Sequence, residues 1–158
     1  MIFFFLAAII SLVPSGTERI PAGLLNVTGG CDTELSRHVY HPKRLVVLKP
    51  CIEVTGKLVF RRDEPDGDAH LRLELDPQFK SLLNTRNRTA QHGALVVEPI
   101  CEKKPVQKDA IAVCRGVTGI DIPKLGTRVR VLGPYVRDDA PNHGWNEIHP
   151  PTSITVEP

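Results

Sequence analysis

The sequence predicts an all-β domain with one short helix. Short segments in which apolar and polar side chains alternate recur along the chain, a pattern typical of half-buried strands. Residues 63–68, DEPDGD, separate two of these segments and contain the Pro and Asp-Gly pairs that favour tight turns. Residues 106–115 instead place their apolar side chains at helical spacing. The chain is therefore expected to consist mainly of strands.

The chain has 158 residues, the size of a single domain with one hydrophobic core. Its hydrophobic content of 41% and its charged content of 24% are ordinary for a folded soluble protein. The net charge of +2 does not by itself favour nucleic acid or an anionic membrane as a partner.

The N-terminus carries an apolar run over residues 2–13, followed by Pro14, Ser15 and Gly16. The run is shorter than the roughly 20 residues that a transmembrane helix needs. It is typical of the apolar region of a secretory signal, although no Lys or Arg precedes it. We therefore expect a signal-like segment over residues 1–15 and a secreted or extracytoplasmic protein. A buried N-terminal helix is the alternative, and only an uncleaved segment would tether the protein to a membrane.

Four cysteines are present: Cys31, Cys51, Cys101 and Cys114. None forms a C-x-x-C pair, which argues against a zinc knuckle or a thioredoxin-type site. An even number of cysteines behind a signal-like segment predicts two disulfides in an oxidising compartment. Of the three possible pairings we favour the sequential one, Cys31–Cys51 and Cys101–Cys114, because the second bond would tie a strand end to the helix that follows. Buried free thiols are the alternative.

Residues 16–50 mix Pro, Gly, Thr and Asn and predict an extended lead-in, with a short apolar stretch at residues 44–48. That stretch is either an edge strand or a lead into the domain, which we expect over residues 51–158. The first long strand is predicted at residues 51–62, where Gly56 indicates a bulge or a sharp coil.

The second strand is predicted at residues 69–76 and shows the clearest alternation. The side chains expected to face the core are Leu71, Leu73 and Leu75. Those expected to point away are His70, Arg72 and Glu74. The later elements are a helical turn and loop over 77–93, a strand over 94–100 with Pro99 at an exposed edge or strand end, the helix over 106–115, a strand over 127–137, and a strand over 145–149 that resumes at 153–156.

This order of three strands, a helix and two strands resembles that of the OB-fold, a five-stranded Greek-key barrel. The resemblance covers residues 51–156. The phrases VTGKLV, DGDAHLRLELD, ALVVEPIC and HGWNEIHP are also similar to those of a group of small exported microbial proteins that is uncharacterised, so this likeness implies no activity.

The OB-fold resemblance implies that ligands bind beside the loops that join strands one and two and strands four and five, here residues 62–68 and 138–144. Both loops are acidic, and each has a histidine at its edge. Trp145, Glu147 and His149 alternate, so they are expected to share the outer face of the last strand. Carboxylates mixed with imidazoles suit zinc or another transition metal. The candidate ligands of a divalent metal are Asp66, Asp68, His70, Asp138, His143, Glu147 and His149, and the candidate contacts of a polar ligand are Arg72 and Trp145.

Each of these motifs also has a purely structural interpretation. Asp66-Gly67-Asp68 is a common hairpin turn, and Asp138 begins a segment typical of a solvated turn. Trp145 could simply seal the end of the sheet, and His149 could bond backbone groups where the ladder breaks before Pro150.

We therefore expect a binding or interaction module for an unknown small polar ligand or a protein, with no catalytic residue assigned. A metal-dependent phosphodiesterase or nuclease is the enzymatic alternative, with Glu147 or His143 as the base and Arg72 as the phosphate clamp. Single-stranded nucleic-acid binding is a further alternative, but aromatic residues are scarce and the loops at the expected site are acidic.

Overall fold

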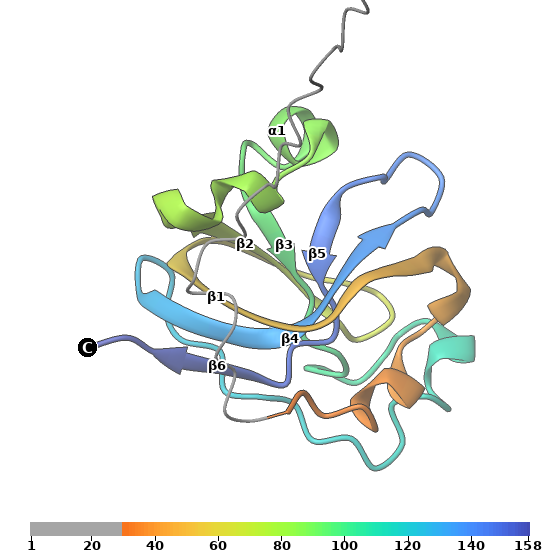
Figure 1. The fold of residues 1–158 in the computed structure, drawn as a ribbon. Coiled ribbons are helices and arrows are strands. Elements are labelled where there is room, and N and C mark those ends of the chain that lie inside the picture. Colours follow the sequence, from red (N-terminus) through yellow and green to blue (C-terminus); the bar gives the residue numbers. More distant parts are fainter. Residues whose placement is uncertain (1–29) are drawn as a thin grey trace, which may run out of the picture.

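The computed structural model describes residues 30–158, so the signal-like segment lies outside the described residues. The strands are β1 (Leu45–Asp63), β2 (Ala69–Leu75), β3 (Leu95–Val97), β4 (Arg128–Asp138), β5 (Asn146–Ile148) and β6 (Ser153–Val156). The helical segments are η2 (Leu35–His38), η3 (Pro42–Arg44), η4 (Pro77–Leu82), α1 (Thr85–Ala90) and η5 (Lys108–Ala110). Strands dominate and the helices are short (Figure 1), which confirms the all-β prediction.

The six strands form one sheet, and the pairing of β4 with β1 closes a circuit of five of them. β1 pairs antiparallel with β2 along one edge and with β4 along the other. β2 pairs antiparallel with β3, β3 pairs parallel with β5, and β5 pairs antiparallel with β4. β6 extends β4 beyond β5. The parallel pair sets Val96 opposite Glu147, so the ends of two strands far apart in sequence lie side by side.

β1 begins at Leu45, earlier than predicted, because residues 45–49 pair with the end of β4. Gly56 lies where β1 and β2 approach closely. A Cβ atom at this position would lie 2.3 Å from the backbone oxygen of Glu74, so the pairing requires glycine here. The register shifts further along, between Leu58 and Phe60, where the strand bends.

The core lies on the face of the sheet that the alternation predicts. The fully buried side chains include Val54, Leu58, Leu71, Leu73, Val129 and Val131. Tyr135 of β4 also faces this core and donates its hydroxyl hydrogen to the backbone oxygen of Leu82, 2.6 Å away. His70 lies outside this hydrophobic core, as the alternation predicts, yet it is only 3% exposed because Glu98 and Gln91 cover it.

The helix predicted at residues 106–115 is absent, and only η5 and turns occupy this segment. The backbone N–H groups of Val106 and Gln107 both donate to the oxygen of Pro65, which ties the start of the segment to the turn between β1 and β2. The residues that follow make i→i−3 bonds, such as Ala110 to Gln107 and Arg115 to Ala112, in place of the i→i−4 bonds of an α-helix. The true α-helix, α1, follows β2 and lies with η4 at one end of the sheet (Figure 1). Asn84 caps it by accepting from the backbone N–H of Asn87 at 2.9 Å, in a capping box.

All four cysteines are paired, and the sequential pairing is confirmed: Cys31 bonds Cys51 and Cys101 bonds Cys114. The first bond joins the lead-in to β1, and the second holds the segment after β3 onto the turn region that contains η5. None of the helices within residues 30–158 is long and apolar enough to cross a membrane.

Candidate functional site

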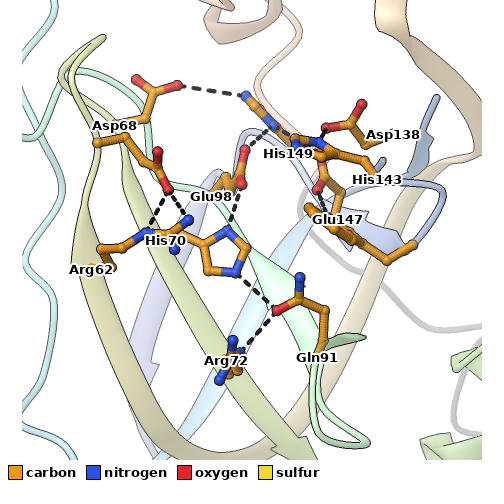
Figure 2. Close-up of polar contacts among 12 residues, drawn as sticks. Arg62, Asp68, His70, Arg72, Gln91, Glu98, Asp138, His143, Glu147 and His149 are labelled. Atoms are coloured by element: carbon orange, nitrogen blue, oxygen red, sulfur yellow. Dashed lines mark hydrogen bonds and ion pairs between the residues drawn. The ribbon is translucent and has the colours of Figure 1, made fainter. Parts of the chain in front are cut away.

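A group of buried ionisable side chains gathers where β3 and β5 end side by side. Glu98 directly follows β3, Glu147 belongs to β5 and His149 follows it, so the parallel pairing brings the three together. Their potential ligand atoms all lie within 4.8 Å of one another. Figure 2 shows the His149 ring between Asp68 on one side and the two glutamates on the other. We call Glu98, Glu147, His149, His70 and Asp68 the buried polar cluster.

His149 is held by two carboxylates through one ring nitrogen. Its Nδ1 atom lies 3.0 Å from Oε1 of Glu147 and 3.0 Å from Oε2 of Glu98. Burial alone would lower the pKa of His149, but the two neighbouring carboxylates outweigh it and raise the pKa to about 10. The same contacts, working against burial, hold the pKa of Glu98 well below its ordinary value.

Glu147 has an additional donor on its other oxygen. The indole Nε1–H of Trp145 donates to Oε2 of Glu147 at 2.9 Å. Burial and the nearby Glu98 charge raise the pKa of Glu147 above its ordinary value. Since Glu147 is 0% exposed, its carboxylate is available to its neighbours in the cluster and not to solvent.

His70 of β2 extends the cluster towards Gln91 and Arg72. Its Nδ1 atom lies 2.9 Å from Oε1 of Glu98, and its Nε2 atom lies 3.1 Å from Oε1 of Gln91. Gln91 also accepts from Nε of Arg72 at 2.9 Å. Both ring nitrogens of His70 therefore face oxygen atoms that can accept, an arrangement that favours the doubly protonated ring. Burial opposes this charge, but Glu98 raises the pKa of His70.

Asp68 directly precedes β2, and only one of its two carboxylate oxygens has a hydrogen-bond partner. Its Oδ1 atom accepts from the backbone N–H of Cys101 at 2.9 Å. Its Oδ2 atom has no hydrogen-bond partner, nor does Nε2 of His149, and these two buried atoms lie 3.9 Å apart. Burial, followed by the charge of Asp66, raises the pKa of Asp68 to about 7.

The last residue of β4 is Asp138, which is fully buried and already paired. Arg44 donates to its Oδ2 atom, and Nδ1 of His143 lies 2.7 Å from the same oxygen. The His143 ring stacks on Trp145 with 4.1 Å between ring centroids. Arg44 also lies 3.7 Å from Oε2 of Glu98. Asp138 therefore organises the loop and leaves little room for a further ligand.

A cavity of about 220 Å³ opens beside the buried polar cluster. Its walls come from the lead-in before β1, from the turn between β1 and β2, and from the loop between β4 and β5. We call it the polar hollow. The residues that line it are Tyr40, His41, Arg44, Arg62, Glu64, Asp66, Asp68, His70, Glu98, Ala140, His143 and Trp145.

The structure brings most of the predicted site residues to this one place. Asp66, Asp68, His70, His143 and Trp145 all line the polar hollow, and His149 lies directly behind Asp68.

Trp145, Glu147 and His149 lie outside the hydrophobic core that contains Ile148, as the alternation predicts, but the face that they share is covered and not open to solvent. All three are buried, because β3 pairs alongside β5 and its extension, Glu98, packs against His149. Arg72 lies elsewhere: its guanidinium covers the ring of Phe60 at 4.3 Å and lines a different cavity, beside Gln91.

Sequence reasoning missed Glu98 and Arg44. Glu98 carried a usable signal, since it is a single acid inside an apolar strand segment, ALVVEPI, and such a residue is seldom buried without partners. Arg44 lies in the lead-in, and nothing in its local sequence indicates that it pairs with Asp138.

No protein-family model matches the sequence, and no curated protein matches it. The functional conclusion therefore depends on the geometry and charge of the polar hollow.

Proposed function

We propose that this protein is an OB-fold-like barrel that acts outside the cytoplasm as a binding module, and that its ligand is a cation held at the polar hollow. The circuit of pairings from β1 through β2, β3, β5 and β4 back to β1 supports the barrel. The two disulfides support an oxidising compartment. The hollow lies beside the two loops that the resemblance implies.

We infer that the ligand is a cation because acidic groups outnumber basic groups around the hollow. The acids that line it or lie directly behind it are Glu64, Asp66, Asp68, Glu98, Asp138 and Glu147. The cations in the same region are Arg44, Arg62, His70 and His149. With these six acids and four cations ionised, two negative charges are uncompensated. Charges buried without a partner are costly, so a bound cation would stabilise this arrangement.

The arginines near the hollow are already paired with acids, whereas Asp68 keeps one oxygen without a hydrogen-bond partner. Arg62 donates to Oε1 of Glu64 through Nε at 3.0 Å and NH2 at 2.6 Å. Arg44 is held by Asp138. In contrast, Asp68 has a free oxygen, and burial raises the pKa of the neighbouring Asp66. An anionic ligand would have to displace existing ion pairs, but a cationic ligand would not.

Two observations lead us not to propose the alternatives raised by the sequence. Arg72, the expected phosphate clamp of a phosphodiesterase, does not line the polar hollow, and Glu147, one of its expected bases, is 0% exposed. For nucleic-acid binding, the Phe60 ring would be a natural stacking surface, yet the guanidinium of Arg72 already covers it.

The test is a thermal-melt and calorimetric titration of chelator-treated protein with divalent metal ions and, separately, with an organic cation such as putrescine. We expect at least one of these classes to raise the melting temperature. At 100 times its Kd, a ligand of the folded state adds about 2.7 kcal/mol of stability.

Asp68→Asn should abolish this increase, because it removes the free carboxylate oxygen. Asp121→Asn, an exposed acid away from the hollow, is the matched control and should behave like the parent protein. If no cation of either class binds, or if Asp68→Asn binds as well as the control, the proposed function is wrong.

A further inference from the structure

We infer that the cation is a divalent transition-metal ion of the zinc type, bound between Nε2 of His149 and Oδ2 of Asp68. This inference rests on the proposed function and assigns a chemical class to its ligand. It starts from two atoms of residues next to different strands, Asp68 just before β2 and His149 just after β5, of which Asp68 lines the hollow.

Within residues 30–158, these two atoms are the buried side-chain nitrogen and oxygen atoms that lack a hydrogen-bond partner. His149 is 1% exposed and Asp68 is 4% exposed, so neither atom is open to bulk solvent. An unpaired polar atom in the interior costs about 1–3 kcal/mol. The two atoms face each other at 3.9 Å, so a single partner placed between them would satisfy both.

The contacts of the other ring nitrogen decide what kind of partner fits. Nδ1 of His149 faces the carboxylates of Glu147 and Glu98, so the ring hydrogen is drawn to that side. Binding of a metal ion would displace the Nε2 hydrogen, and the ring, with its remaining hydrogen on Nδ1, would then direct the lone pair of Nε2 at Asp68. A histidine whose second nitrogen donates to a carboxylate is the usual arrangement of a metal-binding imidazole.

A second layer of donors holds this arrangement in place. Trp145 donates to Glu147, and His70 lies within hydrogen-bond distance of Glu98, so both carboxylates that contact His149 are themselves held. On the other side, the backbone N–H of Cys101 holds Oδ1 of Asp68, which leaves Oδ2 directed at His149 (Figure 2). Supporting hydrogen bonds of this kind orient metal ligands and raise their affinity.

The separation also suits a zinc-type ion. Ligand atoms bound to zinc at about 2.0–2.1 Å lie about 3.4 Å apart in a tetrahedral site and at most about 4.1 Å apart. The observed 3.9 Å falls within reach of a small side-chain adjustment. Imidazole nitrogen favours zinc and similar metals over magnesium and calcium, which prefer sites made of oxygen atoms.

Two protein ligands leave further coordination positions open. Asp68 lines the polar hollow, so these positions face space that can hold water or a small exchangeable ligand. The ion would therefore remain reachable from outside, as in sites that exchange a ligand, and unlike a closed structural zinc site.

The test is calorimetric titration of the chelator-treated full chain with Zn²⁺, Co²⁺, Mg²⁺ and Ca²⁺, together with the visible absorption of the Co²⁺ form. We expect one Zn²⁺ or Co²⁺ ion to bind per chain, and Mg²⁺ and Ca²⁺ to bind much more weakly. The visible absorption of the Co²⁺ form should be that of an ion with a low coordination number. Asp68→Asn, which nearly preserves shape, should weaken Zn²⁺ binding by more than about 10-fold, and Asp121→Asn should not change it.

A second variant tests the supporting layer without touching either ligand. Trp145→Phe removes the donor to Glu147 and should weaken Zn²⁺ binding by about 10–100-fold. Exposed histidines that bind zinc adventitiously would do so equally in the parent protein and in Asp68→Asn, and equal binding overturns the inference.

The remaining outcomes separate the two proposals. If putrescine binds in an Asp68-dependent way and no metal does, the proposed function stands and the metal assignment is wrong, with a water molecule as the bridge between the two atoms. If neither binds, both proposals are wrong.

Discussion

The Glu98 carboxylate lies between two buried imidazole rings, with Oε1 2.9 Å from Nδ1 of His70 and Oε2 3.0 Å from Nδ1 of His149. One acid thus links the start of β2 to the residue that follows β5. No other described carboxylate contacts both rings, so the stability of this region depends strongly on it.

Glu98→Gln should destabilise the protein by about 3–5 kcal/mol, because it removes a buried negative charge and leaves its cationic partners uncompensated. Urea unfolding measures the change. Glu74→Gln, an exposed residue of β2, is the control and should stay within about 0.5 kcal/mol of the parent protein. A loss of less than about 1 kcal/mol for Glu98→Gln would contradict the role assigned to this carboxylate.

Tyr135 should make the protein sensitive to alkaline pH. Burial raises its pKa to about 12, whereas a tyrosine in the unfolded chain ionises near pH 10. The contribution of the protonated hydroxyl is complete below pH 10 and is lost as the pH rises towards 12. Stability measured by urea unfolding should therefore fall between these values. In Tyr135→Phe the fall should be smaller, and an unchanged pH dependence in this variant would refute the assignment.

Gly56→Ala should destabilise the protein by about 3 kcal/mol or prevent folding, because the added Cβ would meet the backbone of Glu74 at 2.3 Å. Backbone atoms cannot move aside as a flexible side chain can. Gly30→Ala is the matched control, since no atom lies within 4 Å of the position that its new Cβ would take. Thermal melting of both variants makes the comparison, and similar melting temperatures would count against the close approach of β1 and β2.

Removal of the Cys101–Cys114 disulfide by a double alanine substitution should cost about 3 kcal/mol, as expected for a loop of 13 residues. It should also weaken Zn²⁺ binding, because the backbone of Cys101 positions Asp68. The Cys31–Cys51 pair provides the control: its removal should cost a similar amount of stability without affecting the metal. Equal effects of the two removals on Zn²⁺ affinity would contradict the link between Cys101 and the site.

The strands and both disulfides could be predicted because they follow from local patterns. Alternation in residues 69–76 places Leu71 and Leu73 in the core, and the order of the cysteines matches their pairing. The helix predicted at residues 106–115 is absent, and both ends of this segment are tied to other parts of the chain, the start through Pro65 and the end through the Cys101–Cys114 disulfide.

The site was only partly predictable because it is assembled by a parallel pairing. Asp68 and His149 belong to recognisable polar loops, but the position of Glu98 depends on β3 lying beside β5. Neither strand shows in its own sequence which neighbour it has. The burial of His70 has the same origin, because Glu98 and Gln91 provide partners that the alternation of β2 does not reveal.

The single tryptophan of the chain occupies a position that reports on the site. Trp145 stacks on His143 at the polar hollow and donates to Glu147 behind it. Its fluorescence should respond whenever the hollow fills or the neighbouring imidazole shifts, with no second indole to obscure the signal. The protein therefore contains its own optical probe, and candidate ligands can be screened on unlabelled material in a simple emission assay.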